Sequence, residues 1–243
     1  MKDLSPVKLS DITAFVLAGG LGTRLRSVVG EFPKILAPVS GRPFICRILD
    51  QLSTAGIIRV VLCTGYRAEL VQSELGDSYG TIQLEYSQET SLLGTGGALA
   101  NARHITASPW ILAMNGDSYA ECELRTFWEW HVCSKSKASL LLSEVPDSRR
   151  FGSVQMDEAN KITRFTEKNE AGSAGWVNAG IYLLSDQIIR GIPTDRAVSL
   201  EKEIFPCLAK KGELHGFAGC RRLLDIGTPD SFMEAEKFFA RWK

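Results

Sequence analysis

Two glycine-rich turns, a pair of basic residues and two distant aspartates are the parts of this sequence that could perform phosphate chemistry. The first turn, LAGGLGTRL over residues 17–25, directly follows an apolar run over residues 13–18. Three glycines within four positions let the backbone approach a ligand, and their N–H groups can form an anion-binding concavity. Arg24 adds a planar guanidinium, and Lys34 adds a second cation after Pro33. We therefore expect this turn to bind phosphate groups.

The first turn does not match two common phosphate-binding motifs. The P-loop pattern is absent, and Leu25 stands where the dinucleotide fingerprint requires its third glycine. A tight strand-to-helix turn with a surface arginine is the structural alternative. The neighbouring Thr23-Arg24 and Pro33-Lys34 pairs favour phosphate binding over that alternative.

The second turn, LGTGGA over residues 93–98, leads into a predicted helix. Its glycines would let the backbone approach a flat nucleobase where side chains would obstruct it. The structural alternative is the ordinary first turn of a helix. Glu89, shortly before the turn, could accept hydrogen bonds from the N1–H and amino group of guanine. The alternative for Glu89 is a solvated surface carboxylate.

Two aspartates are candidate ligands of a metal ion. Asp117 follows the apolar run over residues 110–114, and ligands of open α/β sheets collect at the carboxyl ends of strands. A carboxylate beside bound phosphates needs a cation between them, and Mg²⁺ commonly fills that role. Asp225 ends a short apolar run and precedes a Gly-Thr-Pro turn. The two residues lie 108 positions apart, so spacing alone leaves open whether they meet, or whether each only caps a helix or a turn.

Alternating apolar and amphipathic segments must position these residues. Apolar positions over residues 45–52 recur at helical spacing and stop at Gly56. This rhythm of strand and helix predicts a mainly parallel sheet with helices on both faces. The predicted strands cover residues 13–18, 59–64, 81–87 and 110–114, and the predicted helices cover residues 45–55, 68–75 and 96–103.

The pattern changes beyond about residue 137, where strands predominate. Residues 157–161 resemble a hairpin turn, and no Pro-rich, Ser-rich or charged linker separates the two halves. We expect one domain over residues 1–243, with a nucleotide-binding half at about 11–136 and a sugar-binding half at about 137–243. The later strands are predicted over residues 138–145, 152–156, 162–167 and 177–184, and helices over residues 200–211 and 231–242.

Composition excludes several classes of protein. The 28 basic and 28 acidic residues balance, which argues against nucleic-acid binding through a broad basic face. No apolar run reaches the roughly 20 residues of a membrane helix, and the N-terminus lacks an apolar secretory segment. The six cysteines form no C-x-x-C pair, so we expect reduced thiols in the core of a cytoplasmic protein. The three histidines fall outside every motif and show no zinc-ligand spacing.

The first turn together with Pro33-Lys34 resembles the signature loop of the sugar-1-phosphate nucleotidyltransferases, and later motifs follow in that family's order. The resemblance implies an α/β fold, a Rossmann-like three-layer sandwich with a mainly parallel (mixed) central sheet and a small β extension. In the family the loop holds the nucleotide triphosphate. The residues expected around the nucleotide are Leu17, Ala18, Gly19, Gly20, Gly22, Thr23, Arg24, Lys34, Glu89, Gly94, Thr95, Gly96 and Asp117.

The segment Phe165-Thr-Glu167-Lys168 resembles the family's sugar-phosphate element. The resemblance implies that Lys168 binds the acceptor phosphate and that Glu167 binds sugar hydroxyls, although a solvated surface pair is the alternative. Asn169 follows where many members carry proline. The residues expected around the sugar phosphate are Gly116, Gly152, Glu167, Lys168, Asn178 and Gly180, of which Gly152 could equally serve only a hairpin.

The resemblance implies in-line attack of a sugar 1-phosphate on the α-phosphorus of an NTP, with pyrophosphate as the leaving group. Asp117 and Asp225 would share one Mg²⁺, and the catalytic set would be Arg24, Lys34, Asp117 and Lys168. The run over residues 19–44 and the segment SLEKEIFP over residues 199–206 look most like D-glycero-α-D-manno-heptose 1-phosphate guanylyltransferases.

The sequence alone does not distinguish this activity from others within and outside the family. Mannose-1-phosphate guanylyltransferases and the glucose-1-phosphate or N-acetylmuramate-1-phosphate nucleotidyltransferases share the main motifs. A catalytically silent regulatory subunit that binds sugar nucleotides is the alternative of another class. The expected partners are the small-molecule substrates, with no nucleic acid and no membrane, and the family often forms a homodimer.

Overall fold

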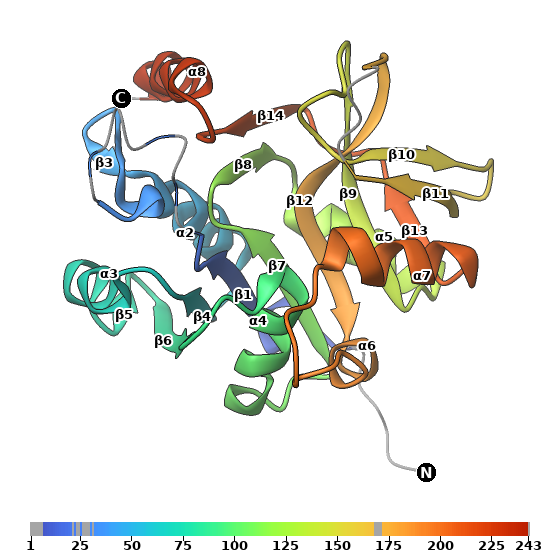
Figure 1. Ribbon diagram of the computed structural model, residues 1–243, viewed down its shortest axis with the longest axis horizontal. Coiled ribbons are helices and arrows are strands. Elements are labelled where there is room, and N and C mark those ends of the chain that lie inside the picture. The colour runs from blue at the N-terminus through green and yellow to red at the C-terminus, as the bar shows by residue number, and fades with distance from the viewer. Residues whose placement is uncertain are drawn as a thin grey trace.

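A ten-stranded mixed sheet forms the centre of the protein (Figure 1). The computed structural model describes residues 7–20, 22, 25, 30, 32–167 and 172–242. Four parallel neighbours make the middle of the sheet, and the strand order β7-β1-β4-β6 places the first strand between the later ones. These strands are β1 (Thr13–Ala18), β4 (Arg59–Thr64), β6 (Ile82–Gln88) and β7 (Trp110–Asn115).

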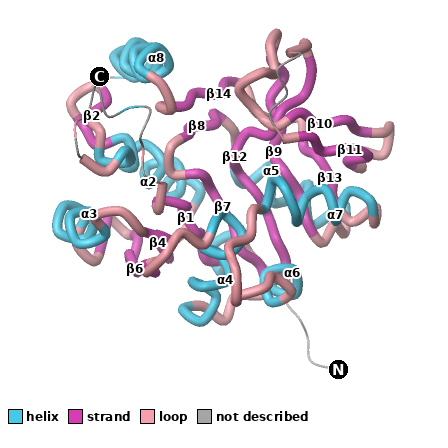
Figure 2. The backbone as a smooth tube through the Cα atoms, viewed as in Figure 1, coloured by secondary structure: helices cyan, strands magenta, loops and turns pink. Residues whose placement is uncertain are grey.

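Helices cover both faces of this sheet, as Figure 2 shows. Alternate residues of β1 face opposite layers, since Ala14 and Val16 join one buried cluster while Phe15 joins the other. This burial on both faces explains the continuous apolar runs and confirms the expected three-layer α/β fold. One layer contains α2 (Phe44–Ala55), α3 (Ala68–Leu75), α5 (Leu124–Ser134) and α8 (Pro229–Phe239), and the other contains α4 (Gly94–Ala102), α6 (Asp186–Arg190) and α7 (Phe205–Lys210).

The second half of the chain extends the same sheet with mostly antiparallel strands. The long strand β12 pairs with β7, and Ile181 lies opposite Met114. Because one sheet runs through both halves, the pairing supports the proposal of a single domain. The added strands are β9 (Ala138–Val145), β10 (Ser153–Met156), β11 (Ile162–Thr166), β12 (Gly175–Ser185) and β13 (Leu214–Phe217).

Short elements complete the fold around the edges of the main sheet. The strand β8 (Ser118–Glu121) pairs antiparallel with β14 (Arg222–Asp225) in a separate two-stranded sheet. The strand β5 (Ser78–Tyr79) pairs with β6, and β2 (Pro38–Val39) pairs with β3 (Arg42–Pro43). The single helical turns are 3-10 helices at Leu9–Asp11, Lys34–Leu36, Arg103–Ile105 and Ala240–Trp242, and a π-helix at Leu200–Ile204.

The helix α5 was not predicted from the sequence, and His131 explains why. The buried face of α5 consists of Leu124, Phe127, Trp128 and His131, at helical spacing. Its fourth member is a histidine, which interrupts the apolar periodicity in the sequence. The strands β8 and β13 and the helix α6, each of four or five residues, were also not predicted.

The expectation that the cysteines are core residues was wrong for two of them. Cys46 and Cys63 are buried, whereas Cys133 on α5 and Cys207 on α7 are exposed. Both exposed residues lie outside the buried faces of their helices. A cysteine within a helix takes the environment of its helical face, which composition alone does not give.

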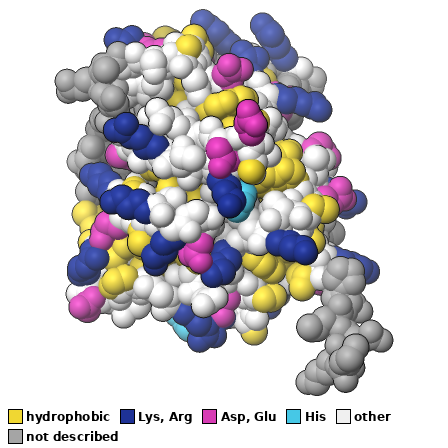
Figure 3. Space-filling view, turned by 90° about the vertical axis from the view of Figure 1, so that its right-hand side faces the viewer, with side chains coloured by type: hydrophobic (Ala, Val, Ile, Leu, Met, Phe, Trp, Pro, Cys, Tyr) yellow, Lys and Arg dark blue, Asp and Glu magenta, His cyan; other side chains and the backbone are white. Residues whose placement is uncertain are grey.

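Positive and negative side chains are interspersed on the face shown in Figure 3, and they do not form one basic field there. This mixture matches the balance of 28 basic and 28 acidic residues. Among the helices that the structure describes, none is both long enough and apolar enough to cross a membrane.

The buried His131 makes the stability of the fold depend on pH. Its side chain is 1% exposed, with Nδ1 2.7 Å from Ser139 Oγ and the ring 4.5 Å from that of Trp110. Burial, followed by the charge of His215, lowers the pKa of His131 to about 4. In the unfolded chain the pKa is about 6.5, so between pH 6.5 and 4 only the unfolded chain takes up this proton. The free energy of unfolding therefore decreases as the pH falls through this window, by about 3 kcal/mol in all.

We expect His131→Asn to flatten this pH dependence, because asparagine carries no titrating proton. Urea unfolding at several pH values between 7 and 4 measures the effect as the difference between variant and wild type. His104→Asn, at an exposed position, is the matched control. An identical pH dependence in His131→Asn and wild type would contradict the prediction.

Candidate active site

The ends of β1 and β7 bring the first glycine-rich turn and Asp117 together. Leu17 lies opposite Asn115 in the parallel register, and Gly116 N donates a hydrogen bond of 2.9 Å to Leu17 O. A Cβ atom on Gly116 would lie only 2.7 Å from Leu17 O, so only glycine fits there. Gly116 is buried in this contact and therefore positions Asp117 beside the turn, while it does not itself line a cavity.

The pairing of β8 with β14 brings Asp117 and Asp225 together. Asp225 lies opposite Ser118 in the antiparallel register, and Ile226 N donates a hydrogen bond of 3.0 Å to Asp117 O. Both aspartates line the same cavity. Strand pairing thus joins two residues that lie 108 positions apart, which the sequence spacing could not reveal.

Cations lie beside both aspartates. Lys34 Nζ is 2.7 Å from Asp117 Oδ2, and an Arg150 Nη atom is 2.5 Å from Asp225 Oδ1. Gly227 lies between the pairs, since a Cβ atom on it would be 2.7 Å from Asp225 Oδ2 and 3.7 Å from Lys34 Nζ. Two carboxylates and two cations therefore converge within one region of the site. The pairing of Arg150 with Asp225 could not be predicted from the sequence, because these residues lie 75 positions apart in the chain.

The first of two neighbouring cavities lies between the two glycine-rich turns and has a volume of about 280 Å³. It gathers most of the residues predicted to surround the nucleotide. Gly22 lies next to it with a φ of +60°, where a Cβ atom would be 3.1 Å from Lys34 Cβ. Thr23 and Arg24 lie outside the described residues. The cavity is lined by Leu17, Ala18, Gly19, Gly20, Lys34, Ile35, Glu89, Leu92, Gly94, Thr95, Ala98, Asn115 and Asp117.

Glu89 is half-buried in the wall of this first cavity. Its Oε2 accepts a hydrogen bond of 3.0 Å from Leu93 N, and its Oε1 lies beside Gly19, 2.8 Å from where a Cβ atom would stand. Burial raises the pKa of the Glu89 carboxyl, and the bond from Leu93 opposes that shift. The carboxylate is therefore held at the cavity wall by the backbone of the second turn.

The glycines of the second turn pack against the protein's own backbone. Gly94 has a φ of +73°, and a Cβ atom there would lie 2.6 Å from Val198 O. The amides of Gly96 and Gly97 donate hydrogen bonds of 2.9 and 3.2 Å to the same oxygen. Gly94 and Thr95 line the cavity, but Gly96 is buried behind it. The glycines of the second turn are thus needed in part because the backbone packs closely against Val198, about a hundred residues later in the chain.

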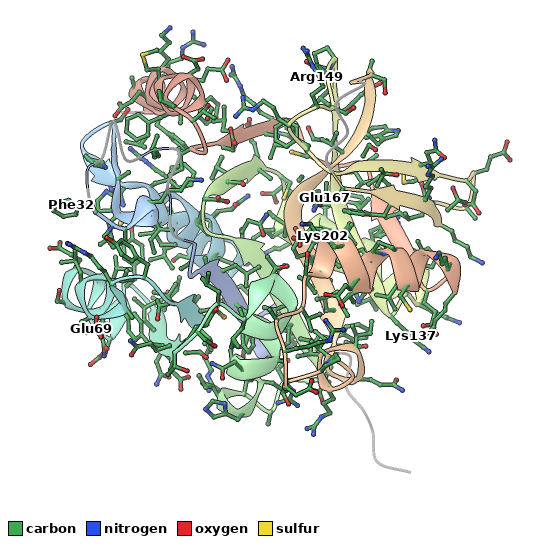
Figure 4. All side chains as sticks on the ribbon, viewed as in Figure 1. Phe32, Glu69, Lys137, Arg149, Glu167 and Lys202 are labelled. Carbon is green, nitrogen blue, oxygen red and sulfur yellow. The ribbon has the colours of Figure 1, made fainter. Side chains whose placement is uncertain are left out.

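The second cavity, also about 280 Å³, continues from the first. The two share Lys34, Thr95, Asn115 and Asp117. Glu167 lies at the end of β11 (Figure 4), and Lys168 lies outside the described residues. The lining residues are Lys34, Thr95, Asn115, Asp117, Ser118, Arg150, Phe151, Gly152, Glu167, Asn178, Ala179, Gly180, Glu201, Leu223, Asp225 and Gly227.

A bulge in β12 shapes the wall of this second cavity. The register of β12 against β9 shifts between Asn178 and Tyr182. Asn178 Oδ1 accepts a hydrogen bond from Gly180 N, and Asn178 Nδ2 donates one to the hydroxyl of Tyr182, each 2.9 Å. Gly180 has a φ of +79°, and a Cβ atom there would approach Asn115 Nδ2 to 2.9 Å. The side chain of Asn178 therefore fixes the bulge that lets Gly180 line the cavity.

A larger cavity of about 650 Å³ lies between α2, β8 and α5, away from these residues. Its lining includes Arg47, Gln51 and Arg221 but none of the residues predicted for the site. It has neither a glycine-rich turn nor the aspartate pair. The two smaller cavities are therefore the candidate active site.

Comparison with known proteins agrees with this geometry. The sequence model of the nucleotidyl transferase family matches residues 13–241. The chain belongs to this family. As a nucleotidyl transferase it has the fold and the glycine-rich turns that the sequence resemblance implied.

Two relatives and two solved structures illustrate the similarity to other nucleotidyl transferases. A mannose-1-phosphate guanylyltransferase of Mycobacterium tuberculosis is 34% identical over 233 residues, which is 95% of this chain but only 65% of that protein. A D-glycero-α-D-manno-heptose 1-phosphate guanylyltransferase of Aneurinibacillus thermoaerophilus is 34% identical over 224 residues, or 92% of this chain and 96% of that protein. The crystal structure of HddC from Yersinia pseudotuberculosis has a TM-score of 0.83 at 32% identity, covering 94% of this chain and 99% of that one. HddC complexed with GMP-PN has a TM-score of 0.82, with the same identity and coverage.

Proposed function

We propose that this nucleotidyl transferase moves a guanylyl group from GTP to a sugar 1-phosphate and releases pyrophosphate. The observation that carries the proposal is the pair of continuous cavities that share Lys34 and Asp117. One cavity has the glycine-rich backbone suited to a nucleotide, and the other has the carboxylates suited to a polyol. Relatives at 34% identity are guanylyltransferases, and a structural neighbour binds GMP-PN.

The chemistry requires positioning and charge neutralisation more than proton transfer. The acceptor phosphate oxygen is already ionised and can attack the α-phosphorus directly, so no general base is needed. Consistent with this, no histidine or cysteine is among the described residues that line either cavity. The ammonium group of Lys34 would stabilise the negative charge on the leaving pyrophosphate. Arg24 and Lys168, outside the described residues, are proposed to neutralise the triphosphate and the acceptor phosphate.

Asp117 and Asp225 fit a Mg²⁺ ion. Two carboxylates at one cavity wall supply the hard oxygen ligands that Mg²⁺ prefers, and the ion usually completes its shell with water and substrate phosphates. When bound, the metal would withdraw charge from phosphate oxygens. Lys34 and Arg150 balance the two carboxylates in the protein as it stands.

The proposed acceptor is D-glycero-α-D-manno-heptose 1-phosphate. Relatives with this activity match over nearly their whole length, whereas the chain spans about two thirds of the mannose-1-phosphate guanylyltransferases. Mannose 1-phosphate is the second candidate, because that relative is equally identical, at 34%. The two acceptors share a manno ring and differ only in the length of the exocyclic chain. We also propose a cytoplasmic location, and the homodimer remains a prediction.

Pyrophosphate release tests the proposed function. Purified protein with Mg²⁺ would be assayed against GTP, ATP, UTP and dTTP, each with the phosphates of the heptose, mannose and glucose. We expect release with GTP and a manno-configured acceptor. Binding of a guanosine diphosphate sugar without turnover on any pair would instead favour the catalytically silent regulatory subunit.

Glu89 is proposed to select guanine, and Glu89→Gln tests this role. An amide offers one acceptor oxygen where the carboxylate offers two, so we expect kcat/KM for GTP to fall about 10- to 100-fold. The weaker activity expected with ATP should stay nearly constant, because adenine lacks the N1–H and the 2-amino group of guanine. Steady-state kinetics with both nucleotides measure the ratio.

The exposed Glu74→Gln is the matched control for Glu89→Gln. Equal losses with GTP and ATP in Glu89→Gln would show that the carboxylate only supports the turn at Leu93.

A further inference from the structure

The segment SLEKEIFP over residues 199–206 contributes one residue that the proposed chemistry has not used. Glu201 lies in the π-helix Leu200–Ile204, whose first turn is capped by Ser199. Single π turns are rare and frequently occur at functional sites. Glu201 lines the second cavity, as does Glu167, which directly follows β11. The cavity wall thus carries two glutamates from different elements.

The Glu201 carboxylate is fixed through one of its two oxygens. Its Oε2 accepts hydrogen bonds from Thr95 Oγ1 at 2.7 Å and from Ser199 Oγ at 2.8 Å. Thr95 Oγ1 in turn accepts a hydrogen bond of 2.9 Å from Leu200 N. Thr95 belongs to the second glycine-rich turn and lines both cavities. The orientation of Glu201 is therefore set by the nucleotide half and by the start of its own helix.

The other oxygen of Glu201 remains for a ligand. Among the residues that the structure describes, none donates a hydrogen bond to Oε1. A carboxylate in a cavity wall from which substrate displaces water needs donors on both oxygens. Sugar hydroxyls are such donors, and a carboxylate can accept from them in a defined direction.

Neither a phosphate nor the metal fits Oε1 as well as a hydroxyl does. A phosphate carries the same sign of charge as Glu201 and would be repelled. Within the described parts of the chain, no three His, Cys, Asp or Glu residues lie close enough to hold a metal ion. We therefore assign Glu201 to the sugar and not to the metal.

We propose that Glu201 determines acceptor specificity by accepting a hydrogen bond from one sugar hydroxyl through Oε1, and that Thr95 positions it. This inference rests on the proposed function, because it assumes a sugar phosphate in the second cavity. It also assigns a second task to Thr95, which joins recognition of the acceptor to the turn beside the nucleotide.

The test uses GTP with α-D-mannose 1-phosphate and its monodeoxy analogues. We expect wild type to lose about 10- to 100-fold in kcat/KM on one deoxy analogue. Glu201→Gln should show a similar decrease in kcat/KM for α-D-mannose 1-phosphate. For that deoxy analogue, the kcat/KM of Glu201→Gln should be little lower than its value for the parent sugar phosphate, and the KM for GTP should stay unchanged. Thr95→Val should raise the KM for the sugar phosphate, and Thr95→Ser should restore it. Glu203→Gln, in the same helical turn, is the matched control.

A purely structural role gives a different result. Wild type and Glu201→Gln would then respond alike to every deoxy analogue, with losses shared between both substrates, and the proposal would be overturned. Calorimetric binding of the same sugar phosphates decides the matter without turnover. If wild type binds these sugar phosphates but releases no pyrophosphate, guanylyl transfer is refuted. A comparison of the affinities of wild type and Glu201→Gln for the same sugar phosphates then still tests the role of Glu201. If wild type binds none of these sugar phosphates, both the proposed function and the proposed role of Glu201 are overturned.

Discussion

Replacing Asp117 with asparagine is expected to lower kcat for pyrophosphate release by about a thousandfold or more, while the protein stays folded. Asp117 lines both cavities, so its charge would act where the nucleotide and the acceptor phosphate are proposed to meet. Asparagine keeps the size and the backbone bond from Ile226, but it removes the negative charge that would hold Mg²⁺. Initial rates at saturating substrates and metal measure the loss.

Metal binding gives a second readout of the Asp117→Asn change. Mn²⁺ in place of Mg²⁺ can be followed by electron paramagnetic resonance, and the variant should bind it more weakly. Asp195→Asn, at an exposed position, is the control for the loss of one negative charge. Turnover close to that of wild type at saturating Mg²⁺ would sink the metal-ligand assignment.

Replacing Lys34 with methionine should lower kcat by a comparable factor, about a thousandfold. The Lys34 side chain is only 12% exposed, and its ammonium group is 2.7 Å from Asp117 Oδ2. Methionine retains an unbranched apolar stem beneath Gly22, so the loss would come from the missing charge near the leaving pyrophosphate. Transient kinetics that isolate the chemical step from product release measure the effect.

The double variant of Lys34 and Asp117 tests whether the two residues act as one unit. Their combined effect should be much smaller than the product of the single effects, because each removes the same charge arrangement. Lys210→Met, at an exposed position, is the control for the removal of an ammonium group. Fully multiplicative losses would argue that the ion pair has no part in catalysis.

The layers of the fold could be predicted because its central strands are buried on both faces. Residues 13–18 and 59–64 form β1 and β4 with the predicted boundaries, and the stripe after Pro43 forms α2 and ends at Gly56. Gly56 has a φ of +88°, the left-handed conformation that commonly ends a helix. Such local signals lie within a few residues of the element they define.

Contacts between distant segments could not be predicted in the same way. Asp117 meets Asp225 through a pairing of two four-residue strands, and Arg150 and Glu201 reach the cavity from elements of the second half. Nothing near these residues in the sequence marks their partners. The same limit affected Gly96, whose amide donates a hydrogen bond to the distant Val198 O. The family resemblance gave the aspartate pair, but not the residues that hold or balance it.

The pairing of β8 with β14 has a consequence for the order in which the site forms during synthesis. Asp117 directly precedes β8, whereas Asp225 is the last residue of β14 and is made 108 positions later. A nascent chain whose residues 222–225 are still inside the ribosome therefore has its glycine-rich turns and Asp117 but only half of the carboxylate pair. The proposed metal site is therefore complete only after residue 225 has been made and β14 has paired with β8, more than a hundred residues after Asp117.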